Sequence, residues 1–362
     1  MKREIFVEQM EKLVAFRTMS QDLNENRAAI EYVQTILPDE ARVELVENNG
    51  ALIMLAGSGR DIYKPEYGYL VHIDVVAGRD DQFELRKDGD SIYGRGVSDM
   101  KFSIPIGVSL LRSMIEAKKD FTFVVTTDEE IGGGNGTNRL ANNLEFRPKV
   151  LIIPDGGDNF ELVNRSKGVA HIWIESEGKP AHASRIWEGK NALHPLMKLA
   201  DQLLEIYEEN EHEKNWGTTL NVGIVNGGVS TNQVCPSAIM KLDFRFPESE
   251  SVEGILNRVI HTAKSIDPSL KVKLAASGDP TYTDPSNRYV RKMMESGQEV
   301  LGRRIEVVGV DGASDGRYFA KYNIPTILIK PNGGDIHGDN EWISVTSVLK
   351  FYEMLEVYLK SV

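Results

Sequence analysis

The sequence has a single cysteine, no long apolar run and no excess of basic residues. One cysteine, Cys235, excludes a disulfide bond within the chain and is typical of a reducing compartment. No apolar run approaches the ~20 residues that a membrane-spanning helix needs. The first residues alternate charged and apolar types and lack the apolar segment of a secretory signal. We therefore expect a cytoplasmic protein with no membrane partner.

Acidic residues outnumber basic ones, and the 362 residues have a formal net charge of −12. Phosphate backbones bind basic surfaces, so this charge argues against nucleic acid as a partner. Clustered carboxylates that bind divalent cations would explain part of the acidity. A chain of this length, with 41% hydrophobic residues, is long enough for two domains.

The stretch from Tyr67 to Lys101 contains the most informative pattern. An apolar strand over residues 69–76 is interrupted by His72 and Asp74, which share one face because side chains alternate along a strand. A buried parallel strand is normally apolar throughout. His72 is either a metal ligand whose other ring N–H is held by a carboxylate, or part of a buried His–Asp hydrogen bond. The pair alone does not separate these interpretations.

Further acidic and histidine residues follow strands or lie in glycine-rich loops. Asp99 follows the turn Gly94-Arg95-Gly96, and other candidates follow the strands FTFVVTT and VLIIP or lie in PNGGDIHGDNE: Glu129, Glu130, Asp155 and His337. Alone, an aspartate such as Asp99 is more often a helix N-cap. Open α/β folds, however, place their sites at the carboxyl edge of the sheet. The repeated pattern therefore favours a metal site.

The order of elements predicts an α/β fold with an insertion. Alternating strands and helices before residue 154 indicate a mostly parallel sheet. An α+β block follows, with a helix over residues 191–209, and β-α alternation then resumes, with helices over 287–301 and 316–322. Because His337 is expected to join His72 and Asp99, we predict a discontinuous metal-binding catalytic domain, residues 1–167 and 277–362. The inserted domain would span residues 168–276.

These motifs resemble the M20 metallopeptidase family. The resemblance rests on His72-x-Asp74, GRGVSDMK around Asp99, TTDEEIGGGNGT around Glu129 and Glu130, and His337. That family includes acetylornithine deacetylase, succinyl-diaminopimelate desuccinylase, aminoacylase and carboxypeptidase G2-like enzymes. It implies a zinc-exopeptidase-like catalytic domain, an inserted lid and dimerisation domain, and a homodimer.

The resemblance also implies two divalent metal ions, usually Zn²⁺, with Co²⁺ or Mn²⁺ tolerated. One metal would be held by His72, Asp99 and Asp155, and the other by Asp99, Glu130 and His337. Asp99 would bridge the two ions. Many members have Glu-Pro where this chain has Pro154-Asp155-Gly156-Gly157-Asp158. Aspartate occurs in dipeptidase-like branches, so Asp155 is favoured over Asp158.

Other roles follow from the same resemblance. Glu129 is expected to be the general base that passes a proton to the leaving amine, and Asp74 to orient His72. His182 in GKPAHAS would reach a partner's active site and help to hold the developing oxyanion. The remaining expectations concern substrate contacts and the backbone: Arg245 and Asn232 binding substrate, Gly333 and Gly334 allowing close backbone approach, and a cis peptide at Asp99–Met100.

The function expected from these residues is hydrolysis of an amide or peptide bond by two metal ions. The substrates would be small molecules that carry a carboxylate, either N-acyl amino acids or short peptides. Alternatives are a dipeptidase or aminopeptidase in place of an N-acyl amino acid deacylase, or an inactive homologue that binds metal or ligand. A nucleotide-binding α/β protein is disfavoured because no glycine fingerprint follows the first strand.

Overall fold

The computed structural model describes residues 1–207 and 215–361. These residues form two compact units. The first comprises Met1–Arg165, Tyr282–Val310 and Ser314–Val362, and the second comprises Ser166–Thr281 and Asp311–Ala313. The sequence predicts boundaries at 167/168 and 276/277, whereas the main changes of unit follow Arg165 and Thr281. Action of the second unit as a lid and in dimerisation stays a prediction.

The first unit is built on a sheet whose centre is parallel. Its path is β1-β2-β6-β3-β7-β15-β8-β13, and β14 pairs with β8. The strands are β1 (Arg42–Asn48), β2 (Ala51–Gly57), β3 (Tyr67–His72), β6 (Phe121–Thr126), β7 (Val150–Ile153), β8 (Leu162–Ser166), β13 (Thr281–Tyr282), β14 (Val307–Val310) and β15 (Thr326–Leu328). Strands β6, β3, β7 and β15 are parallel neighbours, whereas β1, β2 and β8 pair antiparallel. The predicted α/β class with a mostly parallel central sheet is confirmed.

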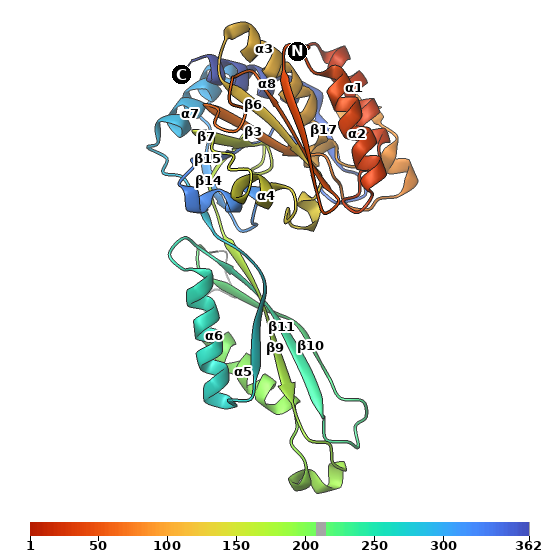
Figure 1. Cartoon of the computed structure of the whole chain (residues 1–362), viewed down its shortest axis with the longest axis vertical. Coiled ribbons are helices and arrows are strands. Elements are labelled where there is room, and N and C mark those ends of the chain that lie inside the picture. Colours follow the sequence, from red (N-terminus) through yellow and green to blue (C-terminus); the bar gives the residue numbers. More distant parts are fainter. Residues whose placement is uncertain (208–214, 362) are drawn as a thin grey trace. The chain divides into compact units, whose positions relative to one another are not determined.

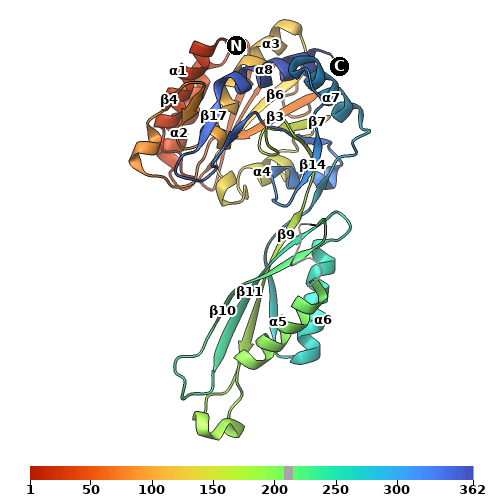
Figure 2. The same ribbon diagram turned by 180° about the vertical axis from the view of Figure 1, so that it is seen from behind.

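Helices cover both faces of this sheet because its buried strands alternate between two cores (Figures 1 and 2). On β3, Tyr69 and Val71 belong to the larger core, and Leu70 belongs to the smaller one. The larger core contains residues of α1 (Arg3–Ala15), α2 (Leu23–Ile36), α3 (Ser103–Ala117), α7 (Arg288–Leu301) and α8 (Val345–Lys360). The smaller core includes α4 (Thr137–Asn142).

The predicted helix over 316–322 is wrong. Two short 3₁₀ helices, Asp315–Tyr318 and Ala320–Tyr322, occupy this stretch. Asp315 accepts a hydrogen bond from the Thr137 hydroxyl, and Arg317 donates to the Gly132 carbonyl at 2.7 Å. These tertiary contacts determine the local conformation more than helical periodicity does.

A second, small sheet in the first unit was not predicted. Its order is β16-β17-β5-β4, formed by β16 (Gly333–Gly334), β17 (Trp342–Ser344), β5 (Ser91–Tyr93) and β4 (Arg86–Asp88). Strand β17 pairs antiparallel with β5, with Trp342 opposite Tyr93 and Ser344 opposite Ser91. This pairing fixes the loop after β16 beside the turn that follows β5.

The second unit has the predicted α+β character, and its described residues form one antiparallel sheet covered by the helices α5 (Leu193–Tyr207) and α6 (Val252–Ile266) (Figure 1). Its sheet order is β10-β11-β9-β12, formed by β9 (Gly168–Glu177), β10 (Thr219–Gly227), β11 (Ser237–Phe246) and β12 (Lys271–Gly278). Alternate residues such as Ile172, Ile174, Met240 and Leu242 pack against α5 and α6. Residues 208 and 209 of the predicted helix lie outside the described residues. No helix among residues 1–207 and 215–361 has the length and apolarity needed to span a membrane.

Candidate metal centre

Three of the predicted ligands lie at or just after the ends of parallel strands of the central sheet. His72 is the last residue of β3, Glu130 follows β6, and Asp155 follows β7. Since neighbouring parallel strands end at the same edge, these side chains gather at the carboxyl edge, where α/β folds place their sites. The tertiary structure adds Asp99 from the turn after β5 and His337 from the loop between β16 and β17.

Asp99 lies between the two histidines. Its Oδ1 is 3.1 Å from Nε2 of His72, and its Oδ2 is 3.1 Å from Nε2 of His337. The same His337 nitrogen is 3.2 Å from the Glu130 carboxylate. Ligand atoms of His72, Asp99 and Glu130 all lie within 4.8 Å of one another. Imidazole and carboxylate donors at this spacing fit divalent metals such as zinc.

The turn that precedes Asp99 depends on glycine. Gly96 has φ +81°, which glycine adopts readily and other residues rarely do. A Cβ at Gly96 would lie 2.6 Å from Cγ1 of Val75, so the backbone also approaches too closely for a larger residue. The peptide bond Asp99–Met100 is cis, as expected from the family resemblance.

Asp74 holds the backbone of the segment that carries Glu129 and Glu130. Its carboxylate accepts hydrogen bonds from the backbone N–H groups of Glu129 (3.2 Å) and Glu130 (3.0 Å), and from the Ser20 hydroxyl (2.6 Å). Nδ1 of His72 lies 3.0 Å from the Asp74 carbonyl oxygen and 3.5 Å from its carboxylate. The carbonyl is thus the nearer acceptor for the Nδ1 proton, which leaves Nε2 free to bind a metal.

Glu129 and Asp155 are half-buried acids close to the ligands. Burial, followed by the negative charge of Asp315, raises the pKa of Glu129 well above its ordinary value. Burial and then the Asp99 charge raise the pKa of Asp155 to about 6. Within the described part of the chain, no residue donates a hydrogen bond to either carboxylate. Bound divalent cations would offset this concentration of negative charge, so the residues fit a metal centre.

The two aspartates considered for one ligand position have different surroundings. Asp158 has an 82% exposed side chain and lies 3.8 Å from Nζ of Lys330. Asp155, in contrast, is close enough to Asp99 and His72 for both to affect its pKa. The surroundings therefore favour Asp155 over Asp158 as the ligand.

The predicted lid residues all lie in the second unit. The backbone N–H of Ala183, next to His182, donates to the Asn232 carbonyl at 2.9 Å, so His182 and Asn232 belong to adjoining loops. Arg245 lies on β11 and forms an ion pair with Asp243, with Nε 2.9 Å from Oδ1. Arg245 pairs with Val169 at the start of β9, whereas His182 lies beyond the other end of β9.

Gly333 and Gly334 form β16 beside the His337 loop. A Cβ at Gly333 would lie 2.5 Å from Oγ of Ser98, and one at Gly334 would lie 3.0 Å from Nε1 of Trp342. Close packing against the protein itself is thus sufficient to require glycine at position 333. Their predicted contact with substrate stays a prediction.

Sequence reasoning missed Glu341, whose side chain is 1% exposed. Its carboxylate accepts hydrogen bonds from the backbone N–H groups of Gly96 (2.9 Å), Ser98 (2.8 Å) and Asp99 (3.1 Å). The only signal in the sequence was an acid four residues after His337, and its partners are remote in the chain.

Comparisons with known proteins show the family of the chain. The sequence profile of peptidase family M20/M25/M40 matches residues 68–361. A succinyl-diaminopimelate desuccinylase of Nitratiruptor sp. is 26% identical over 306 residues, which cover 80% of this chain and 82% of the relative. A second such enzyme, from Dechloromonas aromatica, is 26% identical over 344 residues, covering 88% of each chain.

Solved structures show the same fold. Aminopeptidase PepT from Bacillus cereus superimposes with a TM-score of 0.80 at 19% identity, covering 99% of this chain and 98% of that chain. Human carnosine dipeptidase 1 gives a TM-score of 0.70 at 14% identity, covering 99% and 95%. The family match spans most of the chain and includes all five candidate metal ligands. The chain therefore belongs to peptidase family M20/M25/M40, and it is a hydrolase.

Proposed function

We propose that the chain hydrolyses the amide or peptide bond of small substrates that carry a carboxylate, using two metal ions. The observation that carries this proposal is the position of Asp99, whose two oxygens face His72 and His337. His72, Asp99 and Asp155 would hold one ion, and Asp99, Glu130 and His337 the other. When bound, such ions polarise the scissile carbonyl and activate water.

Glu129 is the proposed general base and acid. The Asp74 carboxylate accepts hydrogen bonds from the backbone N–H groups of both Glu129 and Glu130, so it fixes the backbone that carries the two side chains. Glu130 contacts His337, which leaves the Glu129 carboxylate to accept a proton from the attacking water and deliver it to the departing nitrogen. The raised pKa of Glu129 suits a group that must both accept and release a proton.

A homodimer would combine the predicted lid residues at one substrate. The ladder from Val169–Arg245 to Glu177–Ser237 is eight residues long, about 27 Å at the usual strand rise. Arg245 and His182 of one chain are therefore too far apart to contact the same small substrate. If both act on substrate, they come from different chains: Arg245 to grip a carboxylate and His182 to stabilise the oxyanion.

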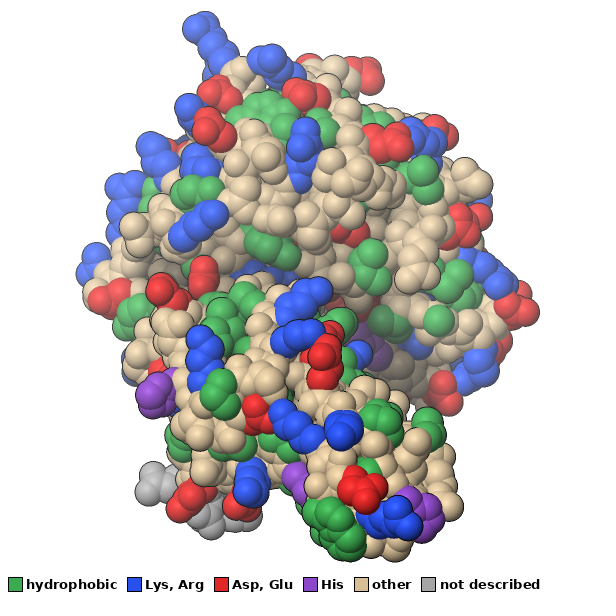
Figure 3. Space-filling model, turned by 60° about the horizontal axis from the view of Figure 1, so that its bottom comes forward, with side chains coloured by type: hydrophobic (Ala, Val, Ile, Leu, Met, Phe, Trp, Pro, Cys, Tyr) green, Lys and Arg blue, Asp and Glu red, His purple; other side chains and the backbone are tan. Residues whose placement is uncertain are grey.

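The surface of the second unit supports self-association. Ile186 and Trp187, which follow His182, are 65% and 76% exposed, and Val229 is 83% exposed. Hydrophobic side chains are also visible among the charged groups in Figure 3. Exposed apolar residues of this kind are common at interfaces between proteins. A chain whose active site needs a partner's His182 would lose activity on dilution below the dimer dissociation constant.

A substrate screen with defined metals tests the proposed function. Metal-free protein would be reconstituted with Zn²⁺, Co²⁺ or Mn²⁺ and assayed against N-acetyl and N-succinyl amino acids and short peptides. We expect about two tightly bound ions per chain and turnover that requires metal. Substrates whose carboxylate is converted to an amide should react much more slowly.

The same screen separates the alternatives. Preference for free α-amino groups would identify a dipeptidase or aminopeptidase, and preference for acylated amines would identify a deacylase. Metal binding without turnover of any substrate would indicate a homologue that binds metal but lacks catalysis. Failure to bind metal would contradict the proposal.

A further inference from the structure

We propose that Glu341 is a positioning residue for the metal centre, because its buried carboxylate joins the turn that carries Asp99 to the loop that carries His337. This inference rests on the proposed function, in which Asp99 and His337 are metal ligands. Among the described residues, the Glu341 carboxylate hydrogen-bonds to backbone N–H groups and to Arg95 rather than to the ligand atoms of Asp99 or His337. It acts through the backbone of both segments.

Four hydrogen bonds connect the Glu341 carboxylate to the turn before and at Asp99. Oε1 accepts from the N–H groups of Ser98 (2.8 Å) and Asp99 (3.1 Å). Oε2 accepts from the N–H of Gly96 (2.9 Å) and from Nη1 of Arg95 (3.0 Å). Converging backbone N–H groups form a concavity that favours an anion. Here a carboxylate of the chain itself occupies that concavity and fixes the backbone of Asp99.

The same cluster holds the His337 segment. Arg95, whose side chain is 4% exposed, donates from Nη2 to the His337 carbonyl at 3.2 Å and to the Ala77 carbonyl at 3.4 Å. The backbone N–H of Gly94 also donates to the Glu341 carbonyl at 3.1 Å. Asp99 and His337 thus share one buried support, formed by Glu341 and Arg95, although they come from distant parts of the sequence.

A carboxylate is required at this position because each oxygen accepts two hydrogen bonds. Glutamine has one amide oxygen and one NH₂ group, and the NH₂ group cannot accept hydrogen bonds from N–H donors. Glu341→Gln therefore keeps the shape but leaves two buried donors without an acceptor. Loss of the partners that orient metal ligands typically weakens metal binding 10–100-fold.

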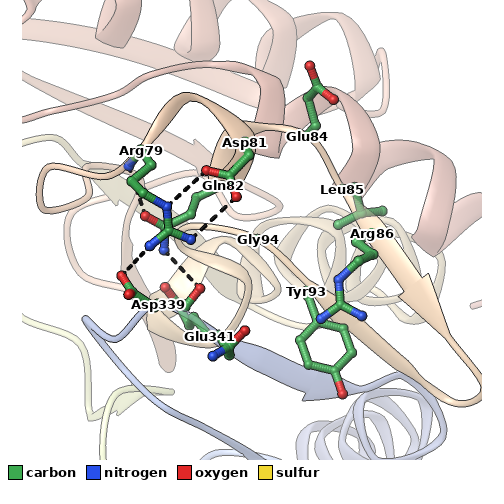
Figure 4. A pocket seen from close by; sticks show the side chains of 11 residues that line it. Arg79, Asp81, Gln82, Glu84, Leu85, Arg86, Tyr93, Gly94, Asp339 and Glu341 are labelled. Atoms are coloured by element: carbon green, nitrogen blue, oxygen red, sulfur yellow. Dashed lines mark hydrogen bonds and ion pairs between the residues drawn. The ribbon is translucent and has the colours of Figure 1, made fainter.

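An exposed ion pair between the His337 loop and the segment before the 3₁₀ helix Asp80–Phe83 provides a control. Arg79 lies 2.5 Å from Asp339 and 3.1 Å from Asp81, at a cavity of about 380 Å³ that Gly94 and Glu341 also line. Figure 4 shows the Arg79 side chain directed at both acids. The side chains of Arg79 and Asp339 are 52% and 75% exposed. Since exposed ion pairs contribute little, Arg79→Met should leave the ligands in place.

Zinc affinity of metal-free protein, measured by competition with a chromophoric chelator, tests the inference. Glu341→Gln should raise the zinc dissociation constant about 10–100-fold, whereas Arg79→Met should change it by less than about 3-fold. With Co²⁺, the Glu341→Gln protein should also show a changed visible absorption spectrum, because the ligands are less well ordered. Circular dichroism of the metal-free proteins checks folding.

Two further variants keep the test decisive. If Glu341→Gln does not fold, Arg95→Met serves as the second variant. It removes the hydrogen bond to the His337 carbonyl and leaves the three backbone hydrogen bonds of Glu341, and it should also raise the zinc dissociation constant. His337→Ala reports on the proposed function: wild-type zinc affinity in that variant would overturn the ligand assignment. If His337→Ala weakens binding but folded Glu341→Gln has wild-type affinity and cobalt spectrum, the positioning role alone is wrong.

Discussion

Nε2 of His337 lies 3.1 Å from Oδ2 of Asp99, while Oδ1 of the same carboxylate is 3.1 Å from Nε2 of His72. One aspartate therefore meets two imidazoles through different oxygens. In the proposed function, Asp99 would therefore hold a metal ion beside each of the two histidines. His72 ends a strand of the central sheet and His337 lies between two strands of the small sheet, so the centre joins segments of both sheets.

Asp99→Asn should lower metal content from about two ions per chain to one or none. The amide has one oxygen and no charge, so it cannot bridge two cations in the way that a carboxylate does. Elemental analysis of purified protein measures this change. Asp39→Asn, at an exposed position, is the matched control and should retain the wild-type metal content. Two ions per chain in Asp99→Asn would show that Asp99 is not the bridge.

Glu129→Gln should lower kcat about 10²–10⁴-fold, because the amide cannot accept the proton of the attacking water. Metal content should stay at the wild-type value, since Glu129 is not a ligand in the proposed function. Steady-state kinetics and elemental analysis of the same sample measure both quantities. Glu31→Gln, on the exposed side of α2, should leave kcat unchanged. Full activity of Glu129→Gln would remove Glu129 as the base.

Gly96→Ala should destabilise the metal-free protein by about 1–3 kcal/mol. Alanine at φ +81° is strained, and its Cβ would clash with Val75 at 2.6 Å. Gly89→Ala is the control for strain alone, because Gly89 has φ +59° but no atom within 4 Å of the added Cβ. Thermal unfolding should show a larger loss for Gly96→Ala than for Gly89→Ala. Equal losses would mean that Val75 moves aside without cost.

Asp90 should make stability depend on pH in the acidic range. Burial acts to raise the pKa of Asp90, but hydrogen bonds from Ser344, Thr346 and Arg3 outweigh it and lower the pKa to about 2. A depressed pKa means that the unfolded chain binds the proton more tightly. The stability contributed by Asp90 is therefore present above about pH 4 and is lost as the pH falls towards 2.

The variant Asp90→Asn measures this contribution directly. At pH 7 it should unfold at a lower temperature than the wild type, and the difference should shrink as the pH falls from about 4 to about 2. Thermal unfolding of both metal-free proteins at a series of pH values gives the difference. A difference that does not depend on pH would show that the Asp90 charge contributes nothing.

Much of the candidate centre could be predicted from sequence, because strand periodicity and the carboxyl-edge rule are local and topological. The alternation around His72, and the acids that follow the strands ending at Thr126 and Ile153, place side chains at one sheet edge before any contact is known. The glycines of Gly94-Arg95-Gly96 mark a turn before Asp99 in the same way. The α+β insertion was also visible as a change in the order of elements.

Only the tertiary structure decided which residues hold the segments of Asp99 and His337 in position. The small sheet consists of strands of two or three residues, which are too short for a periodic signal. Its strands β17 and β5 pair although they are far apart in the sequence. That pairing places Glu341 against the turn at Asp99. The sequence by itself determined which side chains could bind metal. Long-range pairing determined which residues orient those side chains, because a hydrogen bond between remote residues leaves no pattern in either local stretch.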